Sequence, residues 1–231
     1  MRYFRFGLVA FTLFVLGAGQ ATAGVLYTQP SNFGSPTANA VASQNDPAQG
    51  GKFAIAYDNF TLGSAGTVAN VQWQGLYFNP PMQGAITGFE ITFWSNDPAG
   101  GGQPGAALLT QHTAGTAGET FVGLQAGVFP TYNYSLDLTT GFAAAAGTEY
   151  WLSIVPDLTF PPQWGWLSGT GGDGRSVQDF LGTRNFINND DAFSLNDTPQ
   201  TVLEPATLTL LGLGIAGMAA YGWGRRKRRG A

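Results

Sequence analysis

The feature that most limits how this chain can fold is a period-two alternation of apolar and polar residues, which returns between turn signals from Lys52 onward. The alternating segments are 53–57, 71–77, 86–94, 132–138 and 150–155. Within 86–94, Phe89, Ile91 and Phe93 fall on one face, and Glu90 falls on the other. Alternation over four to eight residues is typical of half-buried strands. The pattern therefore predicts a sheet protein.

The breaks between these segments are rich in Gly, Pro, Asn and Asp, as in 95–102, 114–118, 169–174 and 188–191. The chain has 34 Gly residues and only 10% charged residues, which favours short strands joined by tight turns over helices. We count roughly nine or ten strands at a spacing of about 8–12 residues, which predicts a β-sandwich or jelly roll. The chain has no cysteine, so disulfides and thiolate metal sites are excluded.

The N-terminus carries the three parts of a secretory signal peptide in order. Arg2 and Arg5 precede an apolar stretch, 6–19, and Ala21 and Ala23 form a small-x-small cleavage site. Residues 1–23 are therefore predicted to be removed before Gly24, which makes the Sec translocon and signal peptidase partners of the chain. The alternatives are an uncleaved anchor and a short buried helix.

A second apolar run, 206–223, ends the chain just before a basic cluster. Eighteen residues at the helical rise span about 27 Å, enough for a bilayer core, so this run is predicted to be a transmembrane helix. The cluster should stay cytoplasmic under the positive-inside rule, which leaves the preceding region outside. Its members are Arg225, Arg226, Lys227, Arg228 and Arg229.

Charge is strongly segregated along the chain. Between the basic residues of the two ends lie only Lys52, Arg175 and Arg184, against all 14 acidic residues, so this region carries a net charge of −11. Such a field repels phosphate backbones, and we expect no nucleic acid among the partners. It suits an extracellular protein or one that collects divalent cations.

The junction before the apolar run reads Val202, Leu203, Glu204, Pro205. Followed by a Gly/Leu-rich helix and Arg-rich residues, it resembles the PEP-CTERM sorting signal, with Leu203 standing where the usual motif has its first Pro. The resemblance covers about 30 residues, taken here as a sorting tail over 201–231. It implies recognition by an exosortase of a Gram-negative bacterium that makes extracellular polysaccharide, an inner-membrane intermediate, and then a place at the cell surface or in the extracellular matrix. The region 24–200 loosely resembles the β-sandwich ectodomains that often accompany this tail, which implies architecture and no established activity.

Two clusters in the central region are candidate ligand sites. Trp164 and Trp166 are two residues apart and share one strand face, where exposed aromatic rings can stack on sugars, with Asp173 near enough to bond hydroxyls. The alternative is that both pack in the core. Asp190 and Asp191 offer hard oxygen ligands and are the first candidates for a calcium site, although Asp and Asn also build turns without metal. No other cofactor is expected.

Catalysis finds little support in the sequence. The single histidine, His112, lies at the edge of a turn and is interpreted as a solvated loop residue. Glu90, Glu119 and Glu149 are the carboxylates on or near predicted strands that a glycosidase pair would need, but their spacing does not predict pairing. The leading interpretation is a non-enzymatic surface or matrix protein associated with exopolysaccharide. The alternatives are a carbohydrate-binding module acting through Trp164 and Trp166, and a secreted glycan-active hydrolase.

Overall fold

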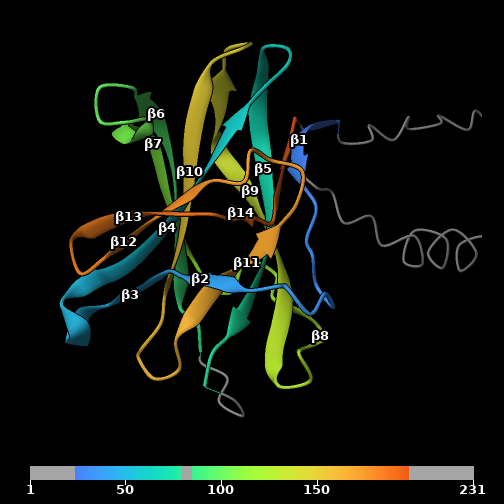
Figure 1. Ribbon diagram of the computed structural model, residues 1–231, viewed down its shortest axis with the longest axis vertical. Coiled ribbons are helices and arrows are strands. Elements are labelled where there is room, and N and C mark those ends of the chain that lie inside the picture. Colours follow the sequence, from blue (N-terminus) through green and yellow to red (C-terminus); the bar gives the residue numbers. More distant parts are fainter. Residues whose placement is uncertain (1–23, 80–84, 198–231) are drawn as a thin grey trace, which may run out of the picture.

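The computed structural model describes residues 24–79 and 85–197, and these residues form two β-sheets that face each other across one core (Figure 1). The eight-stranded sheet contains β1 (Val25–Gln29), β2 (Ala40–Ala42), β5 (Gly66–Tyr77), β8 (Thr120–Gln125), β9 (Phe129–Ala144), β11 (Trp164–Gly169), β14 (Asp190–Asp191) and β15 (Phe193–Asn196). The seven-stranded sheet contains β3 (Gln44–Asp46), β4 (Gly51–Thr61), β6 (Gly88–Asp97), β7 (Gln103–Ala114), β10 (Glu149–Asp157), β12 (Ser176–Phe180) and β13 (Thr183–Ile187). A single 3-10 turn, Pro47–Gln49, joins β3 to β4.

The all-β, two-sheet prediction is confirmed, and every alternating segment of the sequence lies within or overlaps a strand: β4, β5, β6, β9 and β10. The described residues contain 15 strands where roughly nine or ten were expected. The additional strands are short, such as β2, β3 and β14, and two or three residues are too few to show a period. The predicted signal peptide, the 202–205 junction, the transmembrane helix and the basic cluster lie outside the described residues.

Nearly all strand pairs are antiparallel. In the eight-stranded sheet β5 is central, since it pairs with β9 on one edge and with β15 and then β11 on the other. In the seven-stranded sheet β10 lies between β4 and β6, and β12 and β13 extend the β4 edge as a hairpin. Within the residues that the structure describes, no helix is long and apolar enough to cross a membrane.

The core between the sheets is dominated by aromatic rings. Trp73 stacks on Tyr134 with their ring centroids 5.5 Å apart, and Phe93 stacks on Phe142 at 4.3 Å. Phe89 meets Trp73 edge to face at 5.1 Å. Aromatic pairs in these geometries contribute beyond the area that they bury, which is how a cysteine-free domain can be held together by its core alone.

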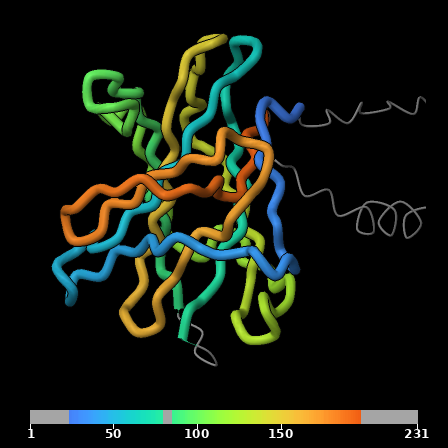
Figure 2. The backbone as a smooth tube through the Cα atoms, in the orientation of Figure 1, coloured from blue at the N-terminus to red at the C-terminus, as the bar shows by residue number. Residues whose placement is uncertain are grey.

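The first and last described strands lie side by side. β1 pairs with β15 over 25–29, and the backbone N–H of Asp197 donates to the carbonyl of Gly24 at 3.0 Å. Figure 2 shows the blue start and the orange-red end of the described chain on the same side of the molecule. The first and last described residues of the body therefore lie next to each other.

Candidate functional site

The tryptophan pair lies in the core. Trp164 and Trp166 share one face of β11, as the spacing predicted, but both side chains are 0% exposed. Trp164 Nε1 donates to the hydroxyl of Tyr134 at 3.2 Å, and Trp166 Nε1 donates to the carbonyl of Ala192 at 2.9 Å. The prediction that these rings stack on a glycan is therefore wrong, because neither ring is accessible and each indole N–H is satisfied inside the protein.

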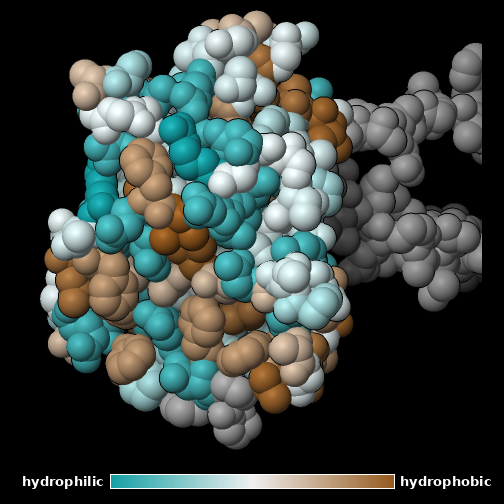
Figure 3. All heavy atoms as spheres, viewed as in Figure 1, coloured by the Kyte–Doolittle hydropathy of each residue, from teal (hydrophilic) through white to brown (hydrophobic). Residues whose placement is uncertain are grey.

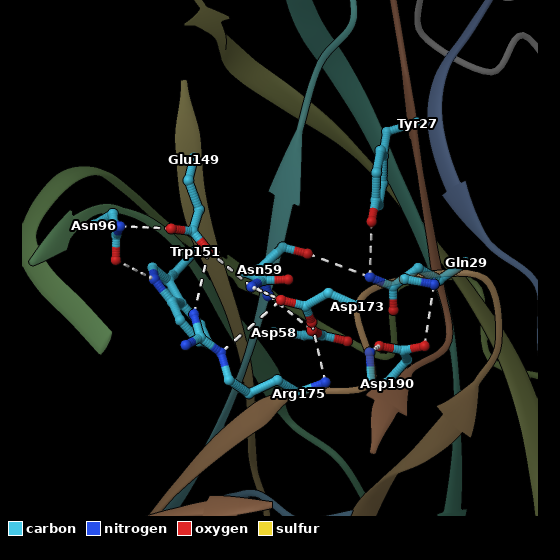
Figure 4. Close-up of polar contacts among 12 residues, drawn as sticks. Tyr27, Gln29, Asp58, Asn59, Asn96, Glu149, Trp151, Asp173, Arg175 and Asp190 are labelled. Carbon is cyan, nitrogen blue, oxygen red and sulfur yellow. Dashed lines mark hydrogen bonds and ion pairs between the residues drawn. The ribbon is translucent and has the colours of Figure 1, made fainter. Parts of the chain in front are cut away.

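Asp173 belongs to a different cluster, on the loop between β11 and β12. Its carboxylate accepts a hydrogen bond from Asn59 Nδ2 at 2.9 Å, and the same nitrogen lies 2.9 Å from Glu149 Oε1 (Figure 4). Asn96 Nδ2 donates to the other Glu149 oxygen, and Trp151 Nε1 donates to Asn96 Oδ1 at 3.1 Å. We name this set the Glu149 network: Asn59, Asn96, Glu149, Trp151, Asp173 and Arg175.

Arg175 completes the network and holds the hairpin onto the sheet. Its guanidinium carbon lies 5.4 Å from the ring centroid of Trp151 on β10 and 5.3 Å from that of Phe186 on β13. Arg175 Nη2 lies 3.3 Å from Glu149 Oε1. Both carboxylates in the network already have cationic or amide partners, so the network acts as a joint between β10 and the β12–β13 hairpin.

Two other carboxyl groups are buried between the sheets. Asp58, on β4, and Asp191, on β14, are both 0% exposed. Burial raises the pKa of Asp58 well above its usual value, against the effect of backbone N–H donors from Asp191 and Asn59. Burial also raises the pKa of Asp191, and the nearby charge of Asp58 adds to this effect. Asp58 Oδ2 lies 2.5 Å from the backbone nitrogen of Asp191, so this bond links the two sheets.

Asp190 and Asp191, the candidate calcium ligands, form hydrogen bonds within the protein. The two oxygens of Asp190 accept backbone N–H bonds from Gly172 at 3.0 Å and Gly174 at 2.7 Å, which pins the loop after β11. Asp191 Oδ1 accepts from Asn189, and its Oδ2 has no hydrogen-bond partner within the described part of the chain. Among residues 24–79 and 85–197, no three His, Cys, Asp or Glu side chains are grouped so as to hold a metal ion. This geometry gives no support to calcium at Asp190 and Asp191.

The carboxylates considered for hydrolysis do not act as a pair. Glu90 pairs with Lys52, and Glu149 belongs to the network above. Glu119 Oε1 accepts hydrogen bonds from the hydroxyls of Tyr77 at 2.7 Å and Tyr134 at 2.9 Å. His112, expected to be a solvated loop residue, lies instead on strand β7, where its half-exposed ring lies 2.6 Å from Asp157 Oδ2.

A surface groove lies elsewhere, on the outer face of the eight-stranded sheet. We name it the outer-face groove. It has a volume of about 380 Å³, within the range usual for ligand sites. One wall is Pro30 and Ser31, which follow β1, and the other is Gly118 and Thr120, around the start of β8. Its floor is made of polar side chains from three strands: Gln72, Gln74, Asn133, Ser135 and Ser194.

Sequence reasoning did not identify this groove. Gln72 and Gln74 are visible in the sequence as the polar partners of Val71 and Trp73, and that alternation was the available signal. The walls, however, come from segments that lie more than 40 residues away on either side of these glutamines. The alternation predicts which face of the strand is polar. The walls that turn this face into a groove are apparent only in the tertiary structure.

These features define the class of protein: a two-sheet, sandwich-like β domain whose outer face carries a polar groove. Residues 27–179 match the family model described as Domain of unknown function (DUF7901), and the chain belongs to this family. Neither the curated proteins nor the solved structures compared with the chain include a match.

Proposed function

We propose that this chain is an exported, non-catalytic protein of the bacterial cell surface or extracellular matrix, sorted by an exosortase and associated with exopolysaccharide. Export uses the Sec translocon and signal peptidase. The C-terminal helix holds the chain in the inner membrane until the 202–205 junction is processed. The acidic β body then functions outside the cell.

The observation that carries the proposal is the environment of Gly24. Its backbone nitrogen lies 2.7 Å from Asp197 Oδ1. Cleavage after Ala23 would turn the Gly24 amide into an ammonium group that already faces a carboxylate. The product of this cleavage would therefore gain an ion pair with Asp197.

This pairing also suits attachment through one end. Because Gly24 and Asp197 meet, the body would hang from the membrane by the segment that follows Asp197, and the new N-terminus would be fastened beside that segment. The remaining surface would be free to meet the matrix. An exposed ion pair of this kind contributes about 1 kcal/mol or less, so it positions the ends more than it stabilises the fold.

The test is mass spectrometry of the protein recovered from the producing cells. We expect an N-terminus at Gly24 and a C-terminus that lacks residues 206–231. Ala23→Phe places a bulky residue at the small-residue position of the cleavage site and should leave residues 1–23 attached. Thr22→Phe is the matched control, since the middle position of the site accepts any residue. Exported protein that keeps residues 206–231 would overturn the sorting step.

A further inference from the structure

We propose that the outer-face groove binds an uncharged segment of polysaccharide. The proposal deepens the function proposed above, on which it rests for the class of ligand. It assigns the contact with polysaccharide to the face of the eight-stranded sheet and gives the chemistry that selects the ligand.

The floor of the groove is arranged in two rows that cross the strands. Register places Gln72 of β5 directly opposite Ser194 of β15 and Ser135 of β9. Gln74, two residues further along β5, is opposite Asn133, which is itself opposite Thr120 of β8. Residues two apart on a strand are separated by about 7 Å, so the rows form a ladder of amides and hydroxyls.

The lining has no charged side chain, although the domain as a whole is strongly acidic. Glu119, which separates Gly118 from Thr120 in one wall, has its carboxylate engaged with the hydroxyls of Tyr77 and Tyr134. Amide and hydroxyl groups each offer a donor and an acceptor, which matches the hydroxyl groups of a sugar. An uncharged site inside a negative field favours a neutral glycan over an anionic one.

A hydrogen bond within the floor holds one of its exposed side chains in place. Gln74 Nε2 donates to Asn133 Oδ1 at 2.6 Å, which fixes the orientation of the Gln74 amide. Gln74 Oε1 is buried and has no hydrogen-bond partner within the described residues. A ligand in the groove cannot reach so buried an atom. Gln74 therefore contributes to the floor by orienting Asn133, whose side chain is exposed.

Both walls are held in place without a ligand. On one side Glu119 bonds to the two tyrosines, and the N–H of Ser135 donates to the carbonyl of Ala117 at 2.9 Å. On the other side the N–H of Thr170 donates to the carbonyl of Pro30 at 2.9 Å. A preformed groove avoids the cost of ordering its walls on binding.

The floor strands also argue against an extended peptide as the occupant. β5, β9 and β15 are each paired on both edges, so none offers a free row of backbone groups for strand addition. What the groove presents is a field of side-chain hydrogen-bonding groups, which recognises hydroxyls.

The experiment is isothermal titration of the purified full chain in detergent micelles. The neutral probes are cellohexaose, laminarihexaose and mannohexaose, and the anionic probe is a galacturonic acid hexamer. We expect saturable binding of at least one neutral probe and weaker binding of the anionic probe. A neutral peptide rich in Ser and Gln tests the competing occupant. Failure of every neutral probe, or tighter binding of the anionic probe or the peptide, would overturn the proposal.

Variants locate the site. Gln74→Ala and Asn133→Ala should each weaken binding of the neutral probe at least tenfold. Gln72→Glu, which keeps the shape of the side chain and adds a charge, should also weaken it. Gln49→Ala, an exposed glutamine in the 3-10 turn between β3 and β4, is the matched control and should leave the affinity unchanged. Thermal denaturation of each variant shows that the domain is folded. Equal affinity in the groove variants and the control would exclude this site.

Because the titration needs no export, its outcome is separate from that of the processing experiment. If the chain binds a neutral oligosaccharide but its tail is never processed in cells, the groove remains the binding site and only the sorting step is rejected.

Discussion

At the scale of single residues, the buried carboxyl groups of Asp58 and Asp191 make the stability of the body depend on pH. Burial raises the pKa of both groups well above 3.8 in the folded protein. The folded state therefore keeps its protons when the unfolded state has lost them. The resulting stabilisation is complete below about pH 3.8 and is lost as the pH rises through the raised folded pKa. Part of the driving force for folding is thus missing at neutral pH.

Asp191→Asn should remove most of this penalty. The amide is uncharged at every pH, and Asp58 loses the like charge that faces it. We expect the melting temperature at pH 8 to rise by about 2–4 °C, the change that roughly 1 kcal/mol produces in a domain of this size. At pH 4 the variant and the parent should differ much less. Calorimetry of both proteins across this range measures the difference.

Asp97→Asn serves as the control for that experiment. Asp97 Oδ1 accepts a hydrogen bond from the N–H of Gly100 at 3.1 Å, and an amide oxygen can accept the same bond. Its melting temperature should stay within about 2 °C of the parent at both pH values. A lower melting temperature for Asp191→Asn at pH 8 would contradict the claim that the buried Asp191 carboxyl destabilises the folded protein at that pH.

Trp166→Phe separates packing from ligand binding. The change removes the hydrogen bond from Nε1 to the carbonyl of Ala192 and leaves a cavity in the core. We expect the free energy of unfolding to fall by roughly 2–4 kcal/mol in urea titrations. The affinity of the folded protein for a neutral oligosaccharide should not change. If Trp166→Phe weakened oligosaccharide binding without lowering stability, Trp166 would contact the ligand after all.

These residues also mark what the sequence alone could predict. The spacing of Trp164 and Trp166 correctly placed both on one face of a strand. Every residue of β11 is buried, however, so the sequence of this strand has no polar alternation that would show which face points to solvent. A Cβ on Gly165 would lie 2.5 Å from Phe78, which shows how closely the second face is covered. Asp58 lies between Ala56 and Phe60 on the core side of β4, a position that alternation assigns to an apolar residue.

At the scale of elements, Arg175 adds side-chain contacts to the pairing of β12 with β4 that attaches the β12–β13 hairpin to its sheet. Arg175 lies between the rings of Trp151 and Phe186 and beside the carboxylate of Glu149. The hairpin exposes Phe180, Leu181 and Phe186, and apolar groups lie among the hydrophilic ones on the face seen in Figure 3. A strand pair with so much exposed apolar surface needs contacts to the sheet beyond its own ladder.

Arg175→Lys should loosen this hairpin selectively. An ammonium group cannot lie flat between two rings or keep the planar donor geometry of a guanidinium. We expect the amides of β12 and β13 to exchange with solvent about tenfold faster, which corresponds to about 1.4 kcal/mol, with β10 unaffected. Lys52→Ala, which removes an exposed pair with Glu90, is the control and should change no exchange rate by that amount. Uniform acceleration across both sheets would indicate global destabilisation instead.

Element prediction succeeded where strands are long and one-sided. β5, β6 and β9 show clear alternation, and their inward residues form the core. Asp190 and Asp191 were expected in a turn, and they form β14, because pairing with Ser168 and Gly169 overrides a sequence typical of turns. The groove depends on such long-range pairings too, which is why its floor was visible as a polar face and its walls were not.

At the scale of the whole molecule, the arrangement of the ends and the arrangement of charge support one topology. Gly24 and Asp197 are hydrogen-bonded to each other, so the first and last described residues lie together. Basic residues flank the outer ends of both apolar runs, and the body between them is acidic. In the proposed topology, the positive ends stay on the cytoplasmic side while the acidic body crosses the inner membrane.

Replacing all five basic residues from Arg225 to Arg229 with Ser tests this topology. In the proposed topology these cations keep the C-terminal end of the apolar run in the cytoplasm, and the 18 residues of the run are only just enough to span a bilayer core as a helix. We expect a C-terminal epitope to become accessible to protease added outside spheroplasts. The parent chain with processing blocked by Pro205→Ala should keep that epitope protected, and the body should be digested or exposed in both. The matched control is Lys52→Ser, which removes an exposed cation of the body whose charge plays no part in orientation. An epitope that stays protected in the five-residue variant would show that the basic cluster does not set the orientation.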